Sequence, residues 1–217
     1  MSQAQPRVPI GVLVSGSGTN LQALIDATQD PSYPARIAVV LCNRPGATGI
    51  ERARSAGIPT HVVRHRQYPD RASFERELVQ HLRDHQVQWV ALAGFMRVLT
   101  DTFLDAFPGR VLNIHPALLP AFPGVHAQRQ ALEYGVRIAG ATVHLVDSGT
   151  DTGPIVTQGV VPVLPGDTED SLKARILTIE HQIYPRALRW AVEDRILVRG
   201  RKVLVDLPPG ESLTQGA

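Results

Sequence analysis

The chain has 217 residues, of which 43% are apolar, and a net charge of +2 with neutral histidines. This composition excludes a disordered chain, and so small a charge gives no reason to expect nucleic-acid binding. A single cysteine, Cys42, excludes an intramolecular disulfide and favours a reducing cytoplasm. No apolar run reaches the ~20 residues of a membrane-spanning helix, and the first residues lack a signal-peptide pattern. We therefore expect a cytoplasmic protein without a membrane partner.

The first half of the chain alternates β-branched runs with amphipathic stretches. This alternation predicts an α/β fold with an open, mostly parallel twisted sheet and helices on both faces. Strands are expected over residues 8–15, 36–42, 60–63 and 88–93. Helices are expected over residues 21–29, 48–56 and 70–86, where apolar side chains recur at helical spacing.

The second half predicts strands over 110–114, 137–146 and 155–163, with helices over 126–134 and 168–194. Pro185 is expected to kink or split the long helix. Residues 195–206 suit a closing strand pair, and the tail 207–217 is rich in Pro, Gly and Ser and is expected to be flexible. Without an evident linker, we expect one domain over 1–217, with a nucleotide-binding half at 1–107 and a catalytic half at 108–206.

A glycine-containing loop separates the first strand from the first helix. Gly18, Thr19 and Asn20 stand where a helix N-terminus presents free N–H groups and the positive end of its dipole. The third glycine of a dinucleotide fingerprint is missing, and no Gly-Lys-Ser/Thr sequence follows. A monophosphate or a phosphoribosyl group suits this loop better than NAD, and a tight turn without a ligand is the alternative interpretation.

Two polar residues lie at the carboxyl end of the strand expected over 110–114, with one apolar residue between them. Asn113 and His115 are two residues apart, so their side chains point to the same face near the carboxyl end of that strand. Such a pair can stabilise a developing oxyanion and handle protons, or it can serve as structural hydrogen-bonding groups. Asp151, in the polar loop after the next strand, is the expected carboxylate partner of His115, whereas Asp147 could simply cap the turn.

Five segments in fixed order together resemble the folate-dependent formyltransferases. They are residues 15–20 (SGSGTN), 92–99 (LAGFMRVL), 112–120 (LNIHPALLP), 151–154 (DTGP) and 180–185 (EHQIYP). The resemblance covers roughly residues 8–190 and implies a Rossmann-like formyltransferase fold. Methionyl-tRNA formyltransferases have a further C-terminal domain and a Trp-Arg-Gly sequence where this chain has residues 121–124, and the deformylases have an N-terminal regulatory domain. These differences favour the branch of the family that acts on glycinamide ribonucleotide.

The resemblance also implies residue roles. The catalytic trio corresponds to Asn113, His115 and Asp151. The residues that correspond to the substrate phosphate and ribose site are Gly18, Thr19, Asn20 and Glu180. The residues that correspond to the folate site are Arg71, Met96, Arg97, Val98, Leu99, Asn113 and Asp147. His144 is a candidate for lining the site, and no metal is expected.

The activity that the resemblance implies is a formyl transfer. The formyl group of 10-formyltetrahydrofolate passes to the amine of N1-(5-phosphoribosyl)glycinamide, in de novo purine (IMP) synthesis, by a monomer or weak homodimer. Three other interpretations stay open. They are a non-catalytic nucleotide sensor, a hydrolase that releases formate from the same folate, and a transferase for a different amine.

Several of these residues also have plain structural interpretations. Glu180 lies on an apolar helical stripe, so its carboxylate needs a partner, either a substrate group or an arginine such as Arg175 or Arg186. Met96 suits core filling and Arg71 suits a solvated helix start. His81 and His85 have the spacing of a metal-ligand pair on a helix but no evident third ligand, which favours surface histidines.

Overall fold

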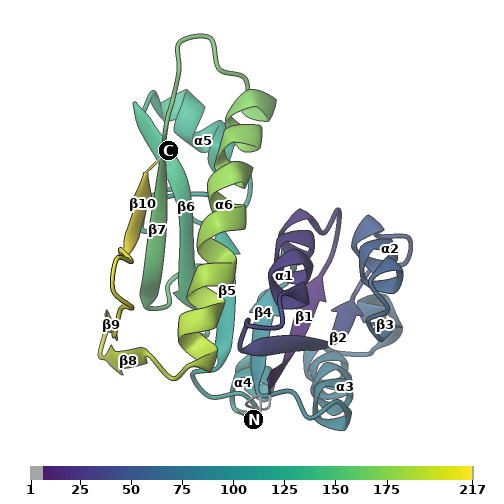
Figure 1. Cartoon of the computed structure of the whole chain (residues 1–217). Helices are drawn as coiled ribbons and strands as arrows, with labels where there is room; N and C mark the ends of the chain where they lie inside the picture. The colour runs from purple at the N-terminus through teal and green to yellow at the C-terminus, as the bar shows by residue number, and fades with distance from the viewer. Residues whose placement is uncertain (1–6, 217) are drawn as a thin grey trace. The chain divides into compact units, whose positions relative to one another are not determined.

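We describe a computed structural model in which residues 7–216 are defined (Figure 1). Residues 1–6 and 217, the two ends of the predicted domain, lie outside the described residues. The chain divides into two compact units, with the boundary between Leu112 and Asn113. This boundary lies five residues after the division expected between residues 107 and 108.

The first unit contains a parallel sheet with the strand order β4-β1-β2-β3. The strands are β1 (Val8–Val14), β2 (Ala35–Cys42), β3 (Thr60–Val62) and β4 (Trp89–Leu92). Most side chains of β1, β2 and β4 are buried, as expected for parallel strands covered on both faces. The carboxyl ends of β1 and β4 therefore lead into neighbouring loops, where ligands of such sheets bind.

The helices of the first unit are α1 (Thr19–Gln29), α2 (Thr48–Ser55), α3 (Arg71–Asp84) and α4 (Asp101–Leu104), with a 3-10 turn η1 (His65–Gln67). In Figure 1, α1 and α2 lie on one side of β2 and α3 lies on the other. Helix α3 approaches β1 closely at Gly11, where a Cβ atom would lie 2.3 Å from Leu82 Cδ2. The glycine therefore lets α3 pack directly on the sheet.

The second unit contains a sheet with the order β5-β6-β7-β10, in which β5 (Val111–His115) spans the unit boundary. Strands β6 (Ile138–Leu145) and β7 (Ile155–Pro162) are antiparallel, with a register shift between Val143 and His144. Helix α5 (Ala127–Tyr134) precedes β6, and α6 (Glu169–Val192) lies along β6 and β7 (Figure 1). Strands β8 (Ile196–Arg199) and β9 (Lys202–Val205) form a separate antiparallel pair.

Helix α6 is not split at Pro185, because it runs as one helix from Glu169 to Val192 through this residue. Its apolar stripe is buried against the sheet, and Gly159 of β7 leaves no room for a Cβ atom, which would lie 2.3 Å from Ile179 Cγ1. Burial of this stripe outweighs the hydrogen bond that a proline removes from a helix.

The C-terminal residues also differ from the flexible tail that was expected. Strand β10 (Thr214–Gly216) pairs in parallel with β7, and the Thr157 hydroxyl donates to the Leu213 carbonyl. The Trp190 indole N–H donates to Glu211 Oε2 at 2.6 Å. The composition of the tail predicted flexibility, because composition does not show that the tail can pair with the exposed edge of β7. The expected α/β fold with a mostly parallel sheet is confirmed, and within residues 7–216 no helix combines the length and hydropathy needed to cross a membrane.

Candidate active site

Strand β5 brings Asn113 and His115 to one side of the second unit, as their alternation predicts. Asp151 comes from the loop after β6 and meets both residues. His115 Nδ1 lies 3.3 Å from Asp151 Oδ2, and Asn113 Nδ2 donates to Asp151 Oδ1 at 3.5 Å. The structure thus gathers the three residues of the predicted catalytic trio.

The His115 ring faces an acceptor at each nitrogen. Nδ1 faces the Asp151 carboxylate, and Nε2 lies 2.8 Å from the Phe122 carbonyl oxygen. Only a ring with protons on both nitrogens can donate to both groups. This arrangement therefore favours the charged imidazolium, and His115 is buried at 4% exposure, where solvent screens the ion pair weakly.

Asp151 is held as a carboxylate by several donors and positive groups. Burial raises the pKa of the Asp151 carboxyl, but the Gly124 N–H and the neighbouring His144 and His115 side chains together outweigh this effect, so the pKa lies below its ordinary value. The Gly124 N–H donates to Asp151 Oδ2 at 2.8 Å, so the loop that contains Phe122 is bonded to both members of the pair.

His144, expected to line the site, bridges the amide and the carboxylate. Its Nε2 lies 3.1 Å from Asn113 Nδ2 and 3.7 Å from Asp151 Oδ1, and its Nδ1 lies 2.9 Å from the Leu145 carbonyl. The irregular register at His144 interrupts the regular pairing of β6 with β7. Such bulges re-aim side chains, and here the result is a histidine that orients Asn113.

The loop after β6 has its own internal support. Asp147 Oδ1 accepts from the Gly149 N–H at 3.1 Å and from the Thr152 hydroxyl at 2.6 Å. Asp151 has a φ of 55°, the left-handed region that non-glycine residues rarely adopt. Asp147 therefore shapes the turn that presents Asp151, which is the capping role considered for it. Its expected contact with folate stays a prediction.

In the first unit, Gly18 stands at the N-cap of α1 with a φ of 68°, and no side chain caps this helix. A Cβ atom at Gly18 would lie 2.6 Å from Gly49 Cα. Both the positive φ and this close approach therefore exclude a larger residue. Arg52 of α2 donates from Nε to the Ser17 carbonyl at 2.9 Å, which puts a guanidinium beside the loop. An uncapped helix start and a neighbouring arginine suit the phosphate site predicted for Gly18, Thr19 and Asn20.

The residues expected to bind folate in the first unit have different environments. Met96 and Val98 are exposed at 61% and 41%, whereas Leu99 is buried. The Arg97 guanidinium lies over the Phe74 ring, 5.6 Å from its centroid. Arg71 is exposed at the first residue of α3. The exposed thioether and isopropyl groups can cover an aromatic ring, and the two arginines can attract carboxylates.

Glu180 is buried on α6, as its place on the apolar stripe predicts. The two arginines considered as its partners have other contacts. Arg175 pairs with Asp167 at 2.7 Å, and Arg186 donates to Gln215 at 2.7 Å. A substrate contact for Glu180 stays a prediction.

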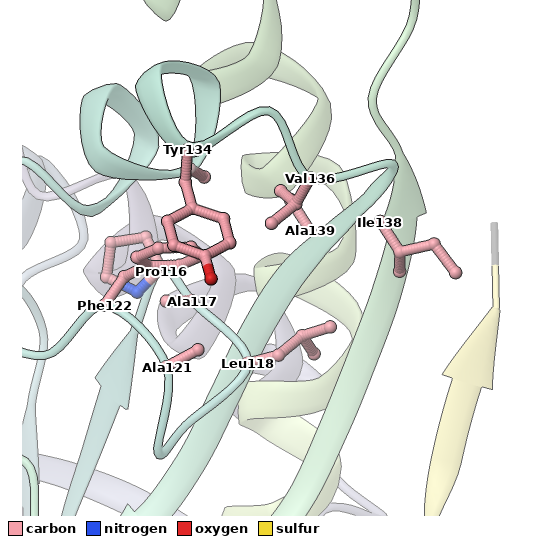
Figure 2. Close-up of a pocket in the computed structure, with 10 residues that line it drawn as sticks. Pro116, Ala117, Leu118, Ala121, Phe122, Tyr134, Val136, Ile138 and Ala139 are labelled. Atoms are coloured by element: carbon pink, nitrogen blue, oxygen red, sulfur yellow. The ribbon is translucent and has the colours of Figure 1, made fainter.

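An apolar cavity of about 380 Å³ lies beside the loop that carries Phe122 (Figure 2). Pro116 and Phe122 form part of its wall, and the largely exposed Tyr134 and Ile138 stand at its rim. The three residues of the predicted catalytic trio do not line this cavity. Phe122 nevertheless links the two features. Its side chain lines the cavity, and its carbonyl oxygen accepts a hydrogen bond from His115 Nε2.

Three histidines of the first unit form a half-buried cluster of a different kind. The His61 ring stacks on His81 with centroids 4.2 Å apart, and His85 meets His61 edge-on. Among residues 7–216, no three His, Cys, Asp or Glu side chains are grouped so that they could hold a metal ion.

The geometry places amide, imidazole and carboxylate groups together beside an ordered loop, and comparison with known proteins identifies the family. The family model described as formyl transferase matches residues 8–188. The chain belongs to the formyl transferase family.

Relatives and solved structures agree with this assignment. The chain is 43% identical to phosphoribosylglycinamide formyltransferase of Escherichia coli (strain K12), over 92% of this chain and 96% of that protein. The crystal structure of glycinamide ribonucleotide transformylase 1 from Symbiobacterium toebii has a TM-score of 0.90 at 51% identity, covering 92% of this chain and 94% of the other. The expected resemblance to this branch of the family is confirmed.

Other relatives are much longer. The trifunctional purine biosynthetic protein adenosine-3 of Drosophila pseudoobscura pseudoobscura is 50% identical over 85% of this chain, which spans 14% of that protein's length.

Sequence reasoning missed three contributors to these sites. Phe122 and Gly124 act through backbone atoms, for which a sequence carries no side-chain signal. Arg52 lies far along the chain from the loop that it contacts, and its place near the start of a predicted helix, one turn after Thr48, was the only available hint.

Proposed function

We propose that this formyl transferase transfers the formyl group of 10-formyltetrahydrofolate to the amine of glycinamide ribonucleotide, in purine synthesis in the cytoplasm. The observation that carries the proposal is the contact of Asp151 with both His115 and Asn113, from a loop 36 residues beyond His115. The names of the relatives from Escherichia coli and Symbiobacterium toebii support the same substrate.

The chemistry of formyl transfer suits these three side chains. When the amine attacks the formyl carbon, negative charge develops on the former carbonyl oxygen. Asn113 and charged His115 are donors that can stabilise this charge, an effect that costs no reorganisation when the donors are already oriented. Asp151 stabilises the charged ring and can accept a proton from the attacking amine, directly or through water. This proton passes to folate N10 as the bond between N10 and the formyl carbon breaks, which releases tetrahydrofolate.

The contacts of His115 also show which hydrogen bond it must exchange for one to the substrate. Its Nε2 proton is donated to the Phe122 carbonyl, so a formyl oxygen at this nitrogen takes the place of that carbonyl. Asn113 Nδ2 faces His144 Nε2 and Asp151 Oδ1 with its two N–H groups, so a formyl oxygen at this amide takes the place of one of these acceptors. Reaction therefore requires a local change at both donors.

Binding features of the first unit fit the two substrates. The uncapped start of α1 beside Arg52 suits a monophosphate. Exposed Met96 and Val98 suit a pterin ring, and Arg71 suits the carboxylate tail of a folate. The proposed mechanism uses only side chains of the chain itself.

The test is a turnover assay with 10-formyltetrahydrofolate, with and without glycinamide ribonucleotide, that follows tetrahydrofolate and formate together. We expect tetrahydrofolate release that requires the amine, without formate. Formate released without the amine would indicate a hydrolase. Absence of turnover from folded protein would indicate another acceptor or a binding module, and either result would contradict the proposal.

A further inference from the structure

The segment Met96–Leu99 has no regular secondary structure, although it connects β4 to α4 and presents two apolar side chains to solvent. Phe95 and Leu99 are buried while Met96 and Val98 are exposed, so each of these side chains has a fixed direction, either into the core or toward solvent. Irregular backbone with exposed apolar groups needs fixed hydrogen bonds to stay in one conformation.

Two buried side chains hold this segment from its two ends. Ser15, at the end of β1, accepts the Met96 N–H at Oγ at 2.9 Å, and its own N–H donates to the Gly94 carbonyl at 3.2 Å. Glu75 of α3 accepts the Thr100 N–H at Oε1 at 3.0 Å and the Thr100 hydroxyl at Oε2. The exposed fractions of Ser15 and Glu75 are 3% and 1%.

The Glu75 contact is unusual for a helix start. Thr100 is the N-cap residue of α4, yet its hydroxyl caps no N–H of that helix and donates to Glu75 instead. A buried carboxylate is costly unless it is well bonded, and both of its oxygens bond to this one residue. Helix α3 also carries Arg71 one turn earlier, so the same helix bears the anchor and a predicted folate contact.

We propose that Ser15 and Glu75 are positioning residues for the folate donor, which act by holding residues 96–99 in their binding conformation. Ser15 also begins the loop that carries Gly18 and Thr19, so it joins the predicted phosphate loop to the predicted folate segment within the first unit. The inference rests on the proposed function, because that function assigns the segment to folate. Neither residue touches the reacting atoms.

The expected magnitude follows from preorganisation. A segment released at one end must be ordered again when the ligand binds, and this cost appears as weaker binding. Loss of one buried hydrogen bond corresponds to about a tenfold loss of affinity. We expect Ser15→Ala and Glu75→Gln each to raise the dissociation constant of tetrahydrofolate about tenfold. The KM for 10-formyltetrahydrofolate should rise in parallel, while kcat changes less than about threefold.

A matched control separates positioning from general stability. Thr28→Val removes a buried hydroxyl of the same unit, whose hydrogen bond to the Ile25 carbonyl is 3.0 Å long and remote from the segment. This variant should lose thermal stability as Ser15→Ala does but should bind tetrahydrofolate like the wild type. A purely structural role for Ser15 and Glu75 predicts that all three variants behave alike, and that result would overturn the proposal.

Thr100 supplies a second test, should Ser15→Ala fail to fold. Thr100→Ser keeps the hydroxyl and should bind as the wild type does, whereas Thr100→Val should bind as weakly as Glu75→Gln. Because both anchors hold one segment, the double variant Ser15→Ala/Glu75→Gln should lose about 10- to 30-fold, less than the product of the single losses. A full product would mean that the two residues act separately, which contradicts a shared segment.

Direct calorimetry with tetrahydrofolate keeps the two proposals apart. A wild-type chain that binds tetrahydrofolate but does not formylate glycinamide ribonucleotide would overturn the proposed acceptor and leave this test intact. A wild-type chain that binds no tetrahydrofolate would overturn the folate assignment. Wild-type binding with unchanged affinity in Ser15→Ala and Glu75→Gln would overturn the positioning role alone.

Discussion

Replacement of Asp151 by asparagine removes the carboxylate charge beside His115 and leaves the size of the side chain unchanged. The two side chains are 5% and 13% exposed, and two unit charges 3.3 Å apart interact by about 5 kcal/mol at an effective dielectric constant of ~20. This is a ceiling, because water and neighbouring dipoles adjust when the charge is lost. Charge-assisted hydrogen bonds measured in proteins contribute about 1.5–3 kcal/mol, so we expect kcat to fall roughly 10- to 150-fold.

Stability should respond differently from turnover. The amide oxygen of Asp151→Asn can still accept the Gly124 N–H, so the variant should stay folded and unfold only a few degrees below the wild type. The assay is steady-state turnover from pH 5 to 9, together with thermal unfolding of the same samples.

Asp167→Asn is the matched control. Asp167 forms a 2.7 Å ion pair with Arg175 in the same unit, and Arg175 holds its pKa far below the ordinary value. The control should lower the unfolding temperature and leave kcat within about twofold. If Asp151→Asn kept more than a third of wild-type turnover while remaining folded, the assignment of Asp151 as the partner of a charged His115 would be wrong.

Four further predictions follow from other contacts. Asn113→Ala should lower kcat about 100- to 1,000-fold through loss of an oxyanion donor, measured by turnover with folding checked by circular dichroism. His144→Phe should lower kcat about tenfold, because the Asn113 amide loses a bond that orients it, measured in the same assay. Arg52→Ala should raise the KM for glycinamide ribonucleotide about tenfold and leave tetrahydrofolate binding unchanged, measured by steady-state kinetics and calorimetry. The folded state favours the Asp151 carboxylate, so its contribution to stability is present above about pH 4 and is lost as pH falls further, measured by acid unfolding of wild type and Asp151→Asn.

Each of these predictions has a result that contradicts it. Near-full turnover in folded Asn113→Ala would remove the amide from the mechanism, and near-full turnover in folded His144→Phe would remove the orienting role of His144. Arg54→Ala is the control for Arg52→Ala, since Arg54 lies on the same helix with its guanidinium at the surface, 3.2 Å from Glu51. Equal effects of the two substitutions on KM would indicate general charge rather than a local phosphate contact. A stability gap between wild type and Asp151→Asn that persists unchanged below pH 4 would contradict a lowered pKa.

The sequence by itself determined the fold class and the order of most elements. Continuous apolar runs such as the one that forms β1 are typical of parallel strands buried on both faces, and side-chain alternation put Asn113 and His115 on one face. Five motifs in order determined the family. These signals are local or ordered along the chain, so they do not depend on how the elements pack.

Tertiary structure decided the contacts between remote segments. Only the fold brings Asp151 to His115, pairs residues 214–216 with β7 and ties Glu75 to Thr100. The Phe122 carbonyl and the Gly124 N–H are backbone groups, so the residue type at these positions does not predict their contacts with the site. Backbone donors and acceptors are alike along the chain, so only its folded path decides which of them meets a catalytic side chain.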